Sequence, residues 1–399
     1  MNIVEPESVG LSTPRLQRLA NAMQQCIDGG ALAGMITVIA RRGVVAHLGV
    51  YGMMDLARAA PMTTDAIFRL FSMTKPVTSL AALMLCEEGI LHLQDPVQEY
   101  LPEFANLKVW QGEGAPLSQL ERPVTLCDLL THTSGLGYGL DTSTPVNALY
   151  QQKAMLRMDE PMAEKITRMA QLPLHHQPGR AYTYSLSTDV IGRVIEVVSG
   201  MPLDSFLKQR IFEPLGMHDT DFYVPAEKLP RLATLYTAAP QGGLVDVATL
   251  PGDGAQFPFG AWTDKSFKPA FLSGGGGLVS TTTDYLRFAW MLRNHGALDG
   301  ARLVSRKTIE LMTAPQLRPE LSPLPGVNIG LGVTVLTNPA QAQMLGSPGA
   351  YGGSGASHCE FWIDPQEDMI TLLMTQYIHY KPLPVGMTFR ALAAASIED

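Results

Sequence analysis

The first sixty residues carry one helical pattern followed by two strand patterns. Apolar residues recur every three to four positions over residues 12–27, which predicts an amphipathic helix. Two short apolar runs follow at residues 35–40 and 44–49, and Arg41, Arg42 and Gly43 separate them. Two strand patterns on either side of a short turn predict a β-hairpin.

The middle of the chain is dominated by helical periodicity, and strand patterns return near its end. Helical patterns lie at residues 76–88, 125–131, 161–171, 187–199, 203–212 and 280–294, with proline- and glycine-rich stretches between them. Strand patterns lie at residues 327–336, 357–363 and 369–376, before a last helical pattern at 387–397.

This order predicts an α+β fold, that is, an α/β part combined with an all-α part. We expect a central antiparallel β-sheet built from the N- and C-terminal segments and flanked by helices. Residues 1–65 and 270–399 would form this α/β domain. Residues 66–269 would form a mainly helical domain inserted into it.

Composition and charge exclude several classes of protein. The chain has 399 residues, 46% of them hydrophobic and 17% charged, which supports a packed core and excludes a disordered chain. The net charge of −8, with no basic run, argues against a nucleic-acid partner and an anionic membrane surface. The most apolar stretch, residues 77–86, is too short for a membrane span.

Two further features indicate the compartment and the absence of metal. The N-terminal residues are acidic and lack the apolar region of a secretory signal, so we expect a cytoplasmic protein. The four cysteines are scattered singly without metal-ligand spacing, which predicts free thiols and no metal site.

A serine and a lysine stand three residues apart at the start of the 76–88 helical pattern. Ser72 and Lys75 would share one helix face, and a serine becomes a good nucleophile when a neighbouring base takes its proton. The same pair could be a capping serine and a surface lysine. Residues 76–85 are almost wholly apolar, however, so the lysine should be partly buried, where its amine can act as a base.

Two other segments could take part in chemistry. Tyr182 and Tyr184 precede the 187–199 helical pattern, and either could transfer a proton or simply pack as an aromatic side chain. Residues 349–356 are rich in glycine and could bring a backbone N–H close to a ligand, as an oxyanion hole requires. The alternative for this run is a strained turn or a bulge.

Taken together, these motifs resemble those of the serine β-lactamase and penicillin-binding-protein superfamily. The resemblance is to its class C β-lactamase-like branch, and within it most to the family VIII carboxylesterases. It rests on the order of six motifs: FSMTKP at residues 71–76, HTSGL at 132–136, PGRAYTYSL at 178–186, FEPLGM at 212–217, GGLVST at 276–281 and FWIDP at 361–365. The resemblance implies a β-lactamase/transpeptidase-like fold with the active site between its two domains.

The resemblance also implies roles for individual residues. Ser72 matches the acylated serine, Lys75 the lysine of the S-x-x-K motif, and Tyr184 the tyrosine that acts with this lysine in proton transfer. The backbone N–H groups of Ser72 and Ser354 match the oxyanion hole. The substrate-binding positions that follow from the resemblance are Tyr351, Gly352, Gly353, Leu186 and Met73.

Two departures from the β-lactamase pattern favour an ester substrate. Tyr351 stands where β-lactamases have a lysine that binds the substrate carboxylate, and no Lys or Arg lies between Arg318 and Lys381. Losing that charge-assisted hydrogen bond would cost about 1.5–3 kcal/mol of binding. Leu186 replaces an asparagine that would bind a substrate amide. We therefore expect a serine carboxylesterase that hydrolyses short-chain acyl esters without a cofactor, with weak β-lactam hydrolysis compatible with the fold.

We considered four alternative functions. Two of them would use the same fold and motifs, and the other two fit the sequence less well. A β-lactamase or D,D-peptidase-like enzyme and an acyltransferase would use the same fold and motifs. An α/β-hydrolase needs a G-x-S-x-G motif, and no serine of this chain has glycine at both of those positions. A catalytically silent binding protein is disfavoured, because Ser72, Lys75 and Tyr184 are all present. The expected partner is a small-molecule ester; the oligomeric state is not predicted.

Overall fold

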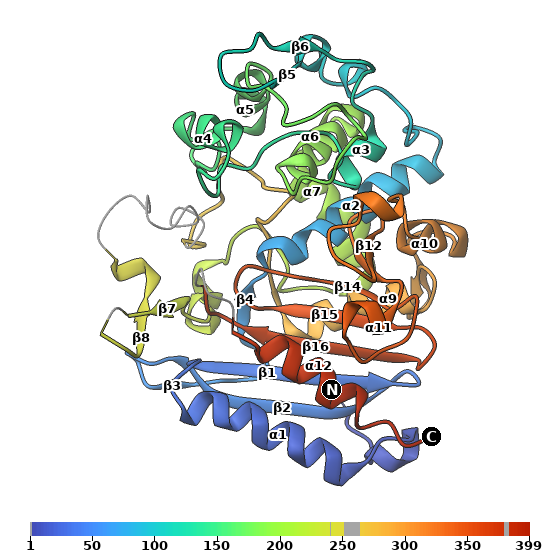
Figure 1. Ribbon diagram of the computed structural model, residues 1–399. Helices are drawn as coiled ribbons and strands as arrows, with labels where there is room; N and C mark the ends of the chain where they lie inside the picture. The colour runs from blue at the N-terminus through green and yellow to red at the C-terminus, as the bar shows by residue number, and fades with distance from the viewer. Residues whose placement is uncertain (1, 240, 251–263, 379–382) are drawn as a thin grey trace.

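The core of the protein is an eight-stranded antiparallel sheet that joins the two ends of the chain (Figure 1). The computed structural model describes residues 2–239, 241–250, 264–378 and 383–399. The sheet order is β12-β13-β14-β15-β16-β1-β2-β3. Its strands are β1 (Gly34–Arg41), β2 (Val44–Asp55), β3 (Ala60–Pro61), β12 (Val327–Ile329), β13 (Thr334–Leu336), β14 (Tyr351–Ser354), β15 (Glu360–Asp364) and β16 (Met369–Thr375).

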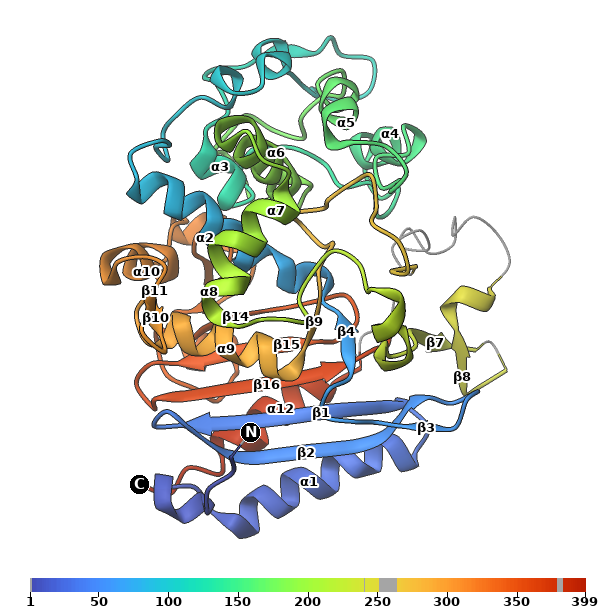
Figure 2. The same ribbon diagram turned by 180° about the vertical axis from the view of Figure 1, so that it is seen from behind.

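The pairing of β1 with β16 confirms the predicted sheet from both chain ends. It runs in register from Met35 opposite Thr375 to Arg41 opposite Met369. Helices α1 (Thr13–Asp28) and α12 (Val385–Ala394) cover one face, and α9 (Thr282–Arg293) packs on β15 and β16 at the other (Figure 2). Every residue of β1 is buried as a result.

Among the described residues between β3 and β9 (Val279–Thr281), most of the regular structure is helical. The α-helices are α2 (Thr74–Glu87), α3 (Leu126–Leu130), α4 (Pro145–Gln152), α5 (Met162–Met169), α6 (Ser187–Ser199), α7 (Leu203–Leu207) and α8 (Glu213–Leu215). Helices α3, α4, α5 and α6 gather at the end of the molecule opposite α1 (Figure 1), while α8 packs beside α9. A two-stranded ladder of β4 (Ile67–Arg69) and β9 (Val279–Thr281) ties the start of this region to its end. The exact division into two domains stays a prediction.

Several predicted boundaries were wrong for physical reasons. Residues 327–336 form two strands, β12 and β13, because the chain reverses between them and the strands pair with each other. The 280–294 helix begins only at Thr282, since Ser280 and Thr281 belong to β9. In the predicted 203–212 helix, only Leu203–Leu207 is α-helical, and Lys208–Phe212 forms a π-helical turn. The glycine-rich run contains a strand, β14, with turns at both of its ends, at residues 348–349 and 356–357.

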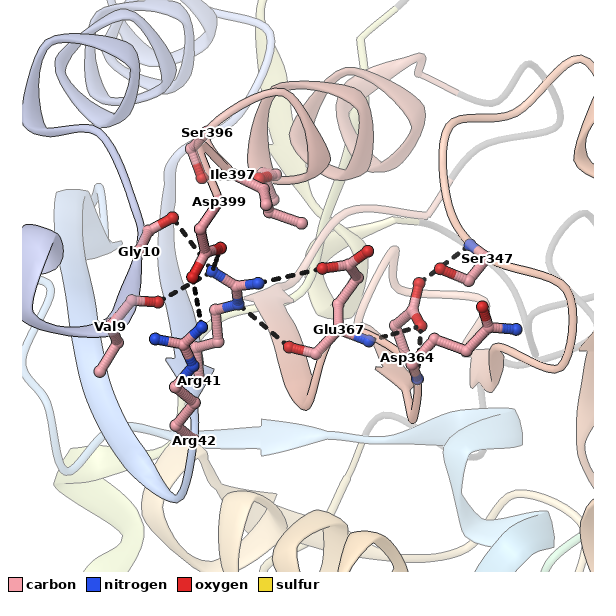
Figure 3. A network of polar contacts seen from close by, with 12 residues as sticks. Val9, Gly10, Arg41, Arg42, Ser347, Asp364, Glu367, Ser396, Ile397 and Asp399 are labelled. Carbon is pink, nitrogen blue, oxygen red and sulfur yellow. Dashed lines mark hydrogen bonds and ion pairs between the residues drawn. The ribbon is translucent and has the colours of Figure 1, made fainter.

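Ion pairs bind the C-terminal residue, Asp399, at the turn between β1 and β2 (Figure 3). The buried Arg41 guanidinium donates to the carbonyl oxygens of Val9 and Gly10, and it pairs with the carboxylates of Asp399 at 2.5 Å and Glu367 at 3.0 Å. Arg42 also pairs with Asp399. These contacts hold both chain ends against the sheet.

Three remaining observations concern the described residues. The four cysteines are free thiols. In the described ranges, no three His, Cys, Asp or Glu side chains are arranged to hold a metal ion. Nor does any helix found there combine the length and apolar character that crossing a bilayer requires.

Candidate active site

Ser72 lies in a strained turn that leads into a buried helix. The turn, Phe71–Met73, is a 3-10 helix that continues directly into α2. Phe71 has a φ of 46°, a left-handed conformation that costs a residue with a side chain about 1–3 kcal/mol. Its neighbours hold it in place: Leu70 N–H donates to the Leu278 carbonyl at 2.9 Å, and the Tyr285 hydroxyl donates to the Met73 carbonyl at 2.9 Å.

The lysine and the tyrosine predicted from the sequence both reach the Ser72 hydroxyl. Lys75 Nζ donates to Ser72 Oγ at 3.2 Å, and the Tyr184 hydroxyl donates to the same oxygen at 2.6 Å. Lys75 lies one helical turn after Ser72 on α2 and is only 5% exposed. Tyr184 lies in the turn before α6 and is 38% exposed. Hence the nucleophile candidate has a buried amine on one side and a solvent-accessible phenol on the other.

Two further rings fix the orientation of Tyr184. The ring of buried Tyr138 stacks on it, with centroids 5.4 Å apart and planes 18° apart, and the His132 ring lies 4.8 Å away. Lys75 Nζ lies 4.7 Å from the centroid of the Tyr184 ring, within cation–π range. Burial raises the pKa of the Tyr138 hydroxyl, so that phenol stays protonated near neutral pH. No motif or spacing in the sequence indicated the stacking role of Tyr138.

His132 and Tyr182 lie close to the site without touching Ser72. Burial, and to a smaller extent the Lys75 charge, lowers the pKa of His132 to about 3, so the imidazole is neutral near pH 7. Its Nδ1 accepts from the Ser185 backbone N–H at 3.3 Å. Tyr182 meets the His132 ring edge-on at 6.1 Å. Of the two candidate tyrosines, Tyr184 is therefore the one that contacts the serine.

Strand β14 passes beside the Ser72 turn. A side chain added at Gly355, directly after β14, would lie 2.1 Å from the Leu70 carbonyl oxygen, so the two backbones are in close contact there. Similarly, a Cβ at Gly352 would lie 2.1 Å from the Phe361 carbonyl oxygen. Ser354 is exposed and Gly353 is half-buried, so this end of β14 is open to solvent near the serine.

Three of the predicted substrate-binding side chains are buried. Tyr351 is 3% exposed and packs in the main core, and Leu186 and Met73 are buried there as well. Burial raises the pKa of the Tyr351 hydroxyl above its ordinary value. These three side chains are therefore largely closed off from solvent in this conformation, and their part in substrate binding stays a prediction. Residues 251–263 of the predicted helical domain lie outside the described residues.

Lys75 has a second hydrogen-bond acceptor, the backbone carbonyl of Gly275. Lys75 Nζ donates to the Gly275 carbonyl oxygen at 2.6 Å, which is its shortest hydrogen bond in the described part of the chain. The Gly275 N–H and the hydroxyl of Ser273, two residues earlier, both donate to the buried carboxylate of Asp189 on α6. This connection could not be predicted, because the three residues are far from Lys75 along the chain and no spacing rule links them.

A cavity of about 390 Å³ lies elsewhere, on the sheet face covered by α12. Trp362, Arg390 and Met344 are among the residues that line it. Since none of Ser72, Lys75 and Tyr184 lines this cavity, we do not assign it to the chemistry at Ser72.

Comparison with known proteins places the chain in a family. A family model described as Beta-lactamase matches residues 19–395. The chain is 35% identical to Protein Rv1367c of Mycobacterium tuberculosis (strain ATCC 25618 / H37Rv), over 89% of this chain and 88% of the relative. It is 30% identical to Esterase EstB of Burkholderia gladioli, over 93% of each chain.

A solved structure agrees with these sequence matches. The structure of EstCE1, described as a hydrolase with promiscuous acyltransferase activity, superposes with a TM-score of 0.81 at 27% identity. The superposition covers 95% of this chain and 98% of EstCE1. The family model, the relatives and this fold all extend over nearly the whole length, and we conclude that the chain belongs to the beta-lactamase family.

Proposed function

We propose that this protein is a serine carboxylesterase that hydrolyses short-chain acyl esters through an acyl-enzyme. The observation that carries the proposal is the convergence of Lys75 Nζ and the Tyr184 hydroxyl on Ser72 Oγ, at 3.2 and 2.6 Å. A serine becomes nucleophilic when a neighbouring group takes its proton. The similarity to EstB and EstCE1 supports an ester as the substrate.

The proposed reaction has two steps. Ser72 Oγ attacks the ester carbonyl while the Lys75/Tyr184 pair accepts its proton, and Tyr184 passes a proton to the departing alkoxide. Water activated by the same pair then hydrolyses the acyl-enzyme. The exposure of Tyr184 supports this role, because both the leaving alcohol and the incoming water must reach its hydroxyl.

We assign the oxyanion hole to the backbone N–H groups of Ser72 and Ser354. The close contact of the residues after β14 with Leu70 supports this assignment, since it brings the end of the strand beside the Ser72 turn. One well-placed donor to a tetrahedral oxyanion contributes about 3–4 kcal/mol of transition-state stabilisation. The absence of a lysine or arginine within β14 favours a neutral ester over a carboxylate-bearing β-lactam.

The experiment compares p-nitrophenyl butyrate with nitrocefin as substrates for the wild-type protein and for Ser72→Ala. We expect the wild type to hydrolyse the ester much faster than the β-lactam, and Ser72→Ala to lose ester hydrolysis while keeping its fold. Faster nitrocefin hydrolysis would favour a β-lactamase, and full ester turnover by Ser72→Ala would exclude the assignment. A series of acyl chain lengths would then define the substrate preference.

Acyl transfer is a second candidate activity, because EstCE1 is described as having a promiscuous acyltransferase activity. The same acyl-enzyme would react with an alcohol instead of water. Adding a primary alcohol to the ester assay and quantifying the new ester tests this activity. A cytoplasmic location, and a site lying between two domains, are further proposals of this account.

A further inference from the structure

A short glycine-rich segment provides Lys75 with a second hydrogen-bond acceptor besides Ser72. We call residues 273–277 the glycine strap. The Gly275 carbonyl accepts from Lys75 Nζ at 2.6 Å, and the Gly274 carbonyl accepts from Thr78 Oγ1 at 2.8 Å. The strap therefore binds the first two turns of α2 on the same side as the lysine amine.

The strap is in turn fixed by one buried carboxylate on α6. Asp189 is 1% exposed, and its Oδ1 accepts from the Ser273 hydroxyl at 2.5 Å and from the Gly275 N–H at 3.0 Å. A Cβ added at Gly275 would lie 2.5 Å from Asp189 Oδ2, so the carboxylate rests directly on that glycine. The hydrogen bond at its N–H and the contact at its Cα restrict the backbone of Gly275, and hence the direction of its carbonyl group.

A buried carboxylate is costly unless its charge and hydrogen-bonding capacity are satisfied. Burial raises the pKa of Asp189, while the positive charge of Lys75 and the two hydrogen bonds oppose that rise. The charged groups that face it are Lys75 from α2 and Lys165 from α5, and the Tyr138 hydroxyl is the other titratable neighbour. Asp189 accepts no described hydrogen bond from Ser72, Lys75 or Tyr184. Besides the direct attraction between its charge and Lys75, it can therefore reach the site through the strap.

We propose that Asp189 is a positioning residue: through Gly275 it holds the Lys75 amine at hydrogen-bond distance from Ser72 Oγ. This inference rests on the proposed function of Ser72, Lys75 and Tyr184. Without the two hydrogen bonds to Asp189, Thr78 and Lys265 would still hold the carbonyls of Gly274 and Gly277. The peptide of Gly275 between them would lose its fixed orientation, since glycine imposes little conformational restriction of its own. Lys75 would then lose a fixed acceptor and, with it, its fixed position.

The test measures how fast a fluorophosphonate labels Ser72, together with kcat and KM for p-nitrophenyl butyrate. We expect Asp189→Ala to lower the labelling rate and kcat at least tenfold and to leave KM within threefold. Asp189→Asn keeps an oxygen that can accept from Ser273 and Gly275, and it should recover activity to within about threefold of wild type. Gly275→Ala, whose new methyl would press on the carboxylate, should show the defect of Asp189→Ala.

The matched control is Asp284→Ala. Asp284 is also a buried carboxylate; it accepts from Asp219 N–H at 2.7 Å and from the Thr220 hydroxyl at 2.9 Å, with no described bond to the strap. This variant should lose stability yet label at the wild-type rate. Normal labelling of folded Asp189→Ala, or of Gly275→Ala should Asp189→Ala fail to fold, would overturn the inference. An Asn variant as defective as the Ala variant would overturn it too. Failure of the wild type to be labelled or to hydrolyse the ester would instead refute the proposed function.

Discussion

At the scale of single residues, the site depends on three side chains that meet at one oxygen. Ser72 and Lys75 could be paired from their spacing alone, because three residues of helix place them on one face. Tyr184 could be preferred to Tyr182 and linked to Ser72 only through the family resemblance, since 112 residues separate it from the serine. The contact of Lys75 with Gly275 could not be predicted from the sequence, because it depends on how the glycine strap packs against Asp189 of α6.

The two tyrosines give a direct prediction. Tyr184→Phe removes the only one of the two hydroxyls that bonds Ser72, and losing a general acid–base group lowers rates about 10²–10⁴-fold. Tyr182→Phe should have a much smaller effect on kcat for p-nitrophenyl butyrate, since its ring only packs against His132. The opposite ranking of the two variants would show that the phenol was wrongly assigned.

Buried His132 predicts how stability depends on pH. Its pKa falls to about 3 on folding, from about 6.5, so below pH 6.5 the unfolded chain binds a proton that the native protein does not. Its contribution is therefore complete above pH 6.5 and is lost as the pH falls toward 3. We expect the free energy of unfolding of His132→Asn, measured in urea, to decline less steeply than that of wild type between pH 6.5 and 4.5. The exposed His92→Asn is the control, and equal slopes for all three proteins would contradict this account.

At the scale of elements, the sheet could be predicted better than its boundaries. Long apolar strands such as β1 and β16 were found, because both of their faces are buried and their pattern is continuous. Strand β14 was not, since two of its four residues are glycines, which have low strand propensity. Its conformation comes from pairing with β13 and β15, which are tertiary neighbours rather than local signals.

Glycine substitutions within β14 test this packing. The Cβ of Gly352→Ala would meet the Phe361 carbonyl oxygen, a backbone atom that can move only with its strand. We expect this variant to lose about 1–3 kcal/mol of unfolding free energy in chemical denaturation. In Gly353→Ala the nearest atom would lie 3.5 Å away, in ordinary contact, so stability should change little. Equal losses in the two variants would show that the close approach at Gly352 is not what restricts the strand.

At the scale of the whole molecule, the antiparallel sheet formed from both chain ends was predictable from the order of the patterns. The way the ends are fastened was not, because the contacts of Arg41 join residues from three distant segments (Figure 3). Glu367, which lies between β15 and β16, is brought to the hairpin by the pairing of β16 with β1. Arg41 can therefore bind Glu367 and Asp399 together only when β1 and β16 have paired.

The ion pairs of Asp399 give a prediction for the molecule as a whole. Hydrogen bonds from Arg41 and then Arg42 lower the pKa of Asp399, so its contribution is present above its ordinary pKa near 3.8 and is lost as the pH falls below it. Asp399→Asn should lower the melting temperature at pH 7, and this difference from wild type should shrink as the pH is lowered below 3.8. Glu398→Gln, which alters only a longer exposed pair with Arg15, should have little effect at either pH. A deficit that persists unchanged at pH 3 would exclude the ion pair as its cause.

The most direct test of the central claim is to identify the residue that carries the acyl group. The protein is mixed with p-nitrophenyl butyrate, quenched in acid within the turnover time, and its peptides are analysed by mass spectrometry. We predict one butyryl group on the peptide that contains Ser72, and no such adduct in Ser72→Ala. A butyryl group on another residue, or ester turnover by wild type with no adduct at Ser72 under any quench time, would contradict the account.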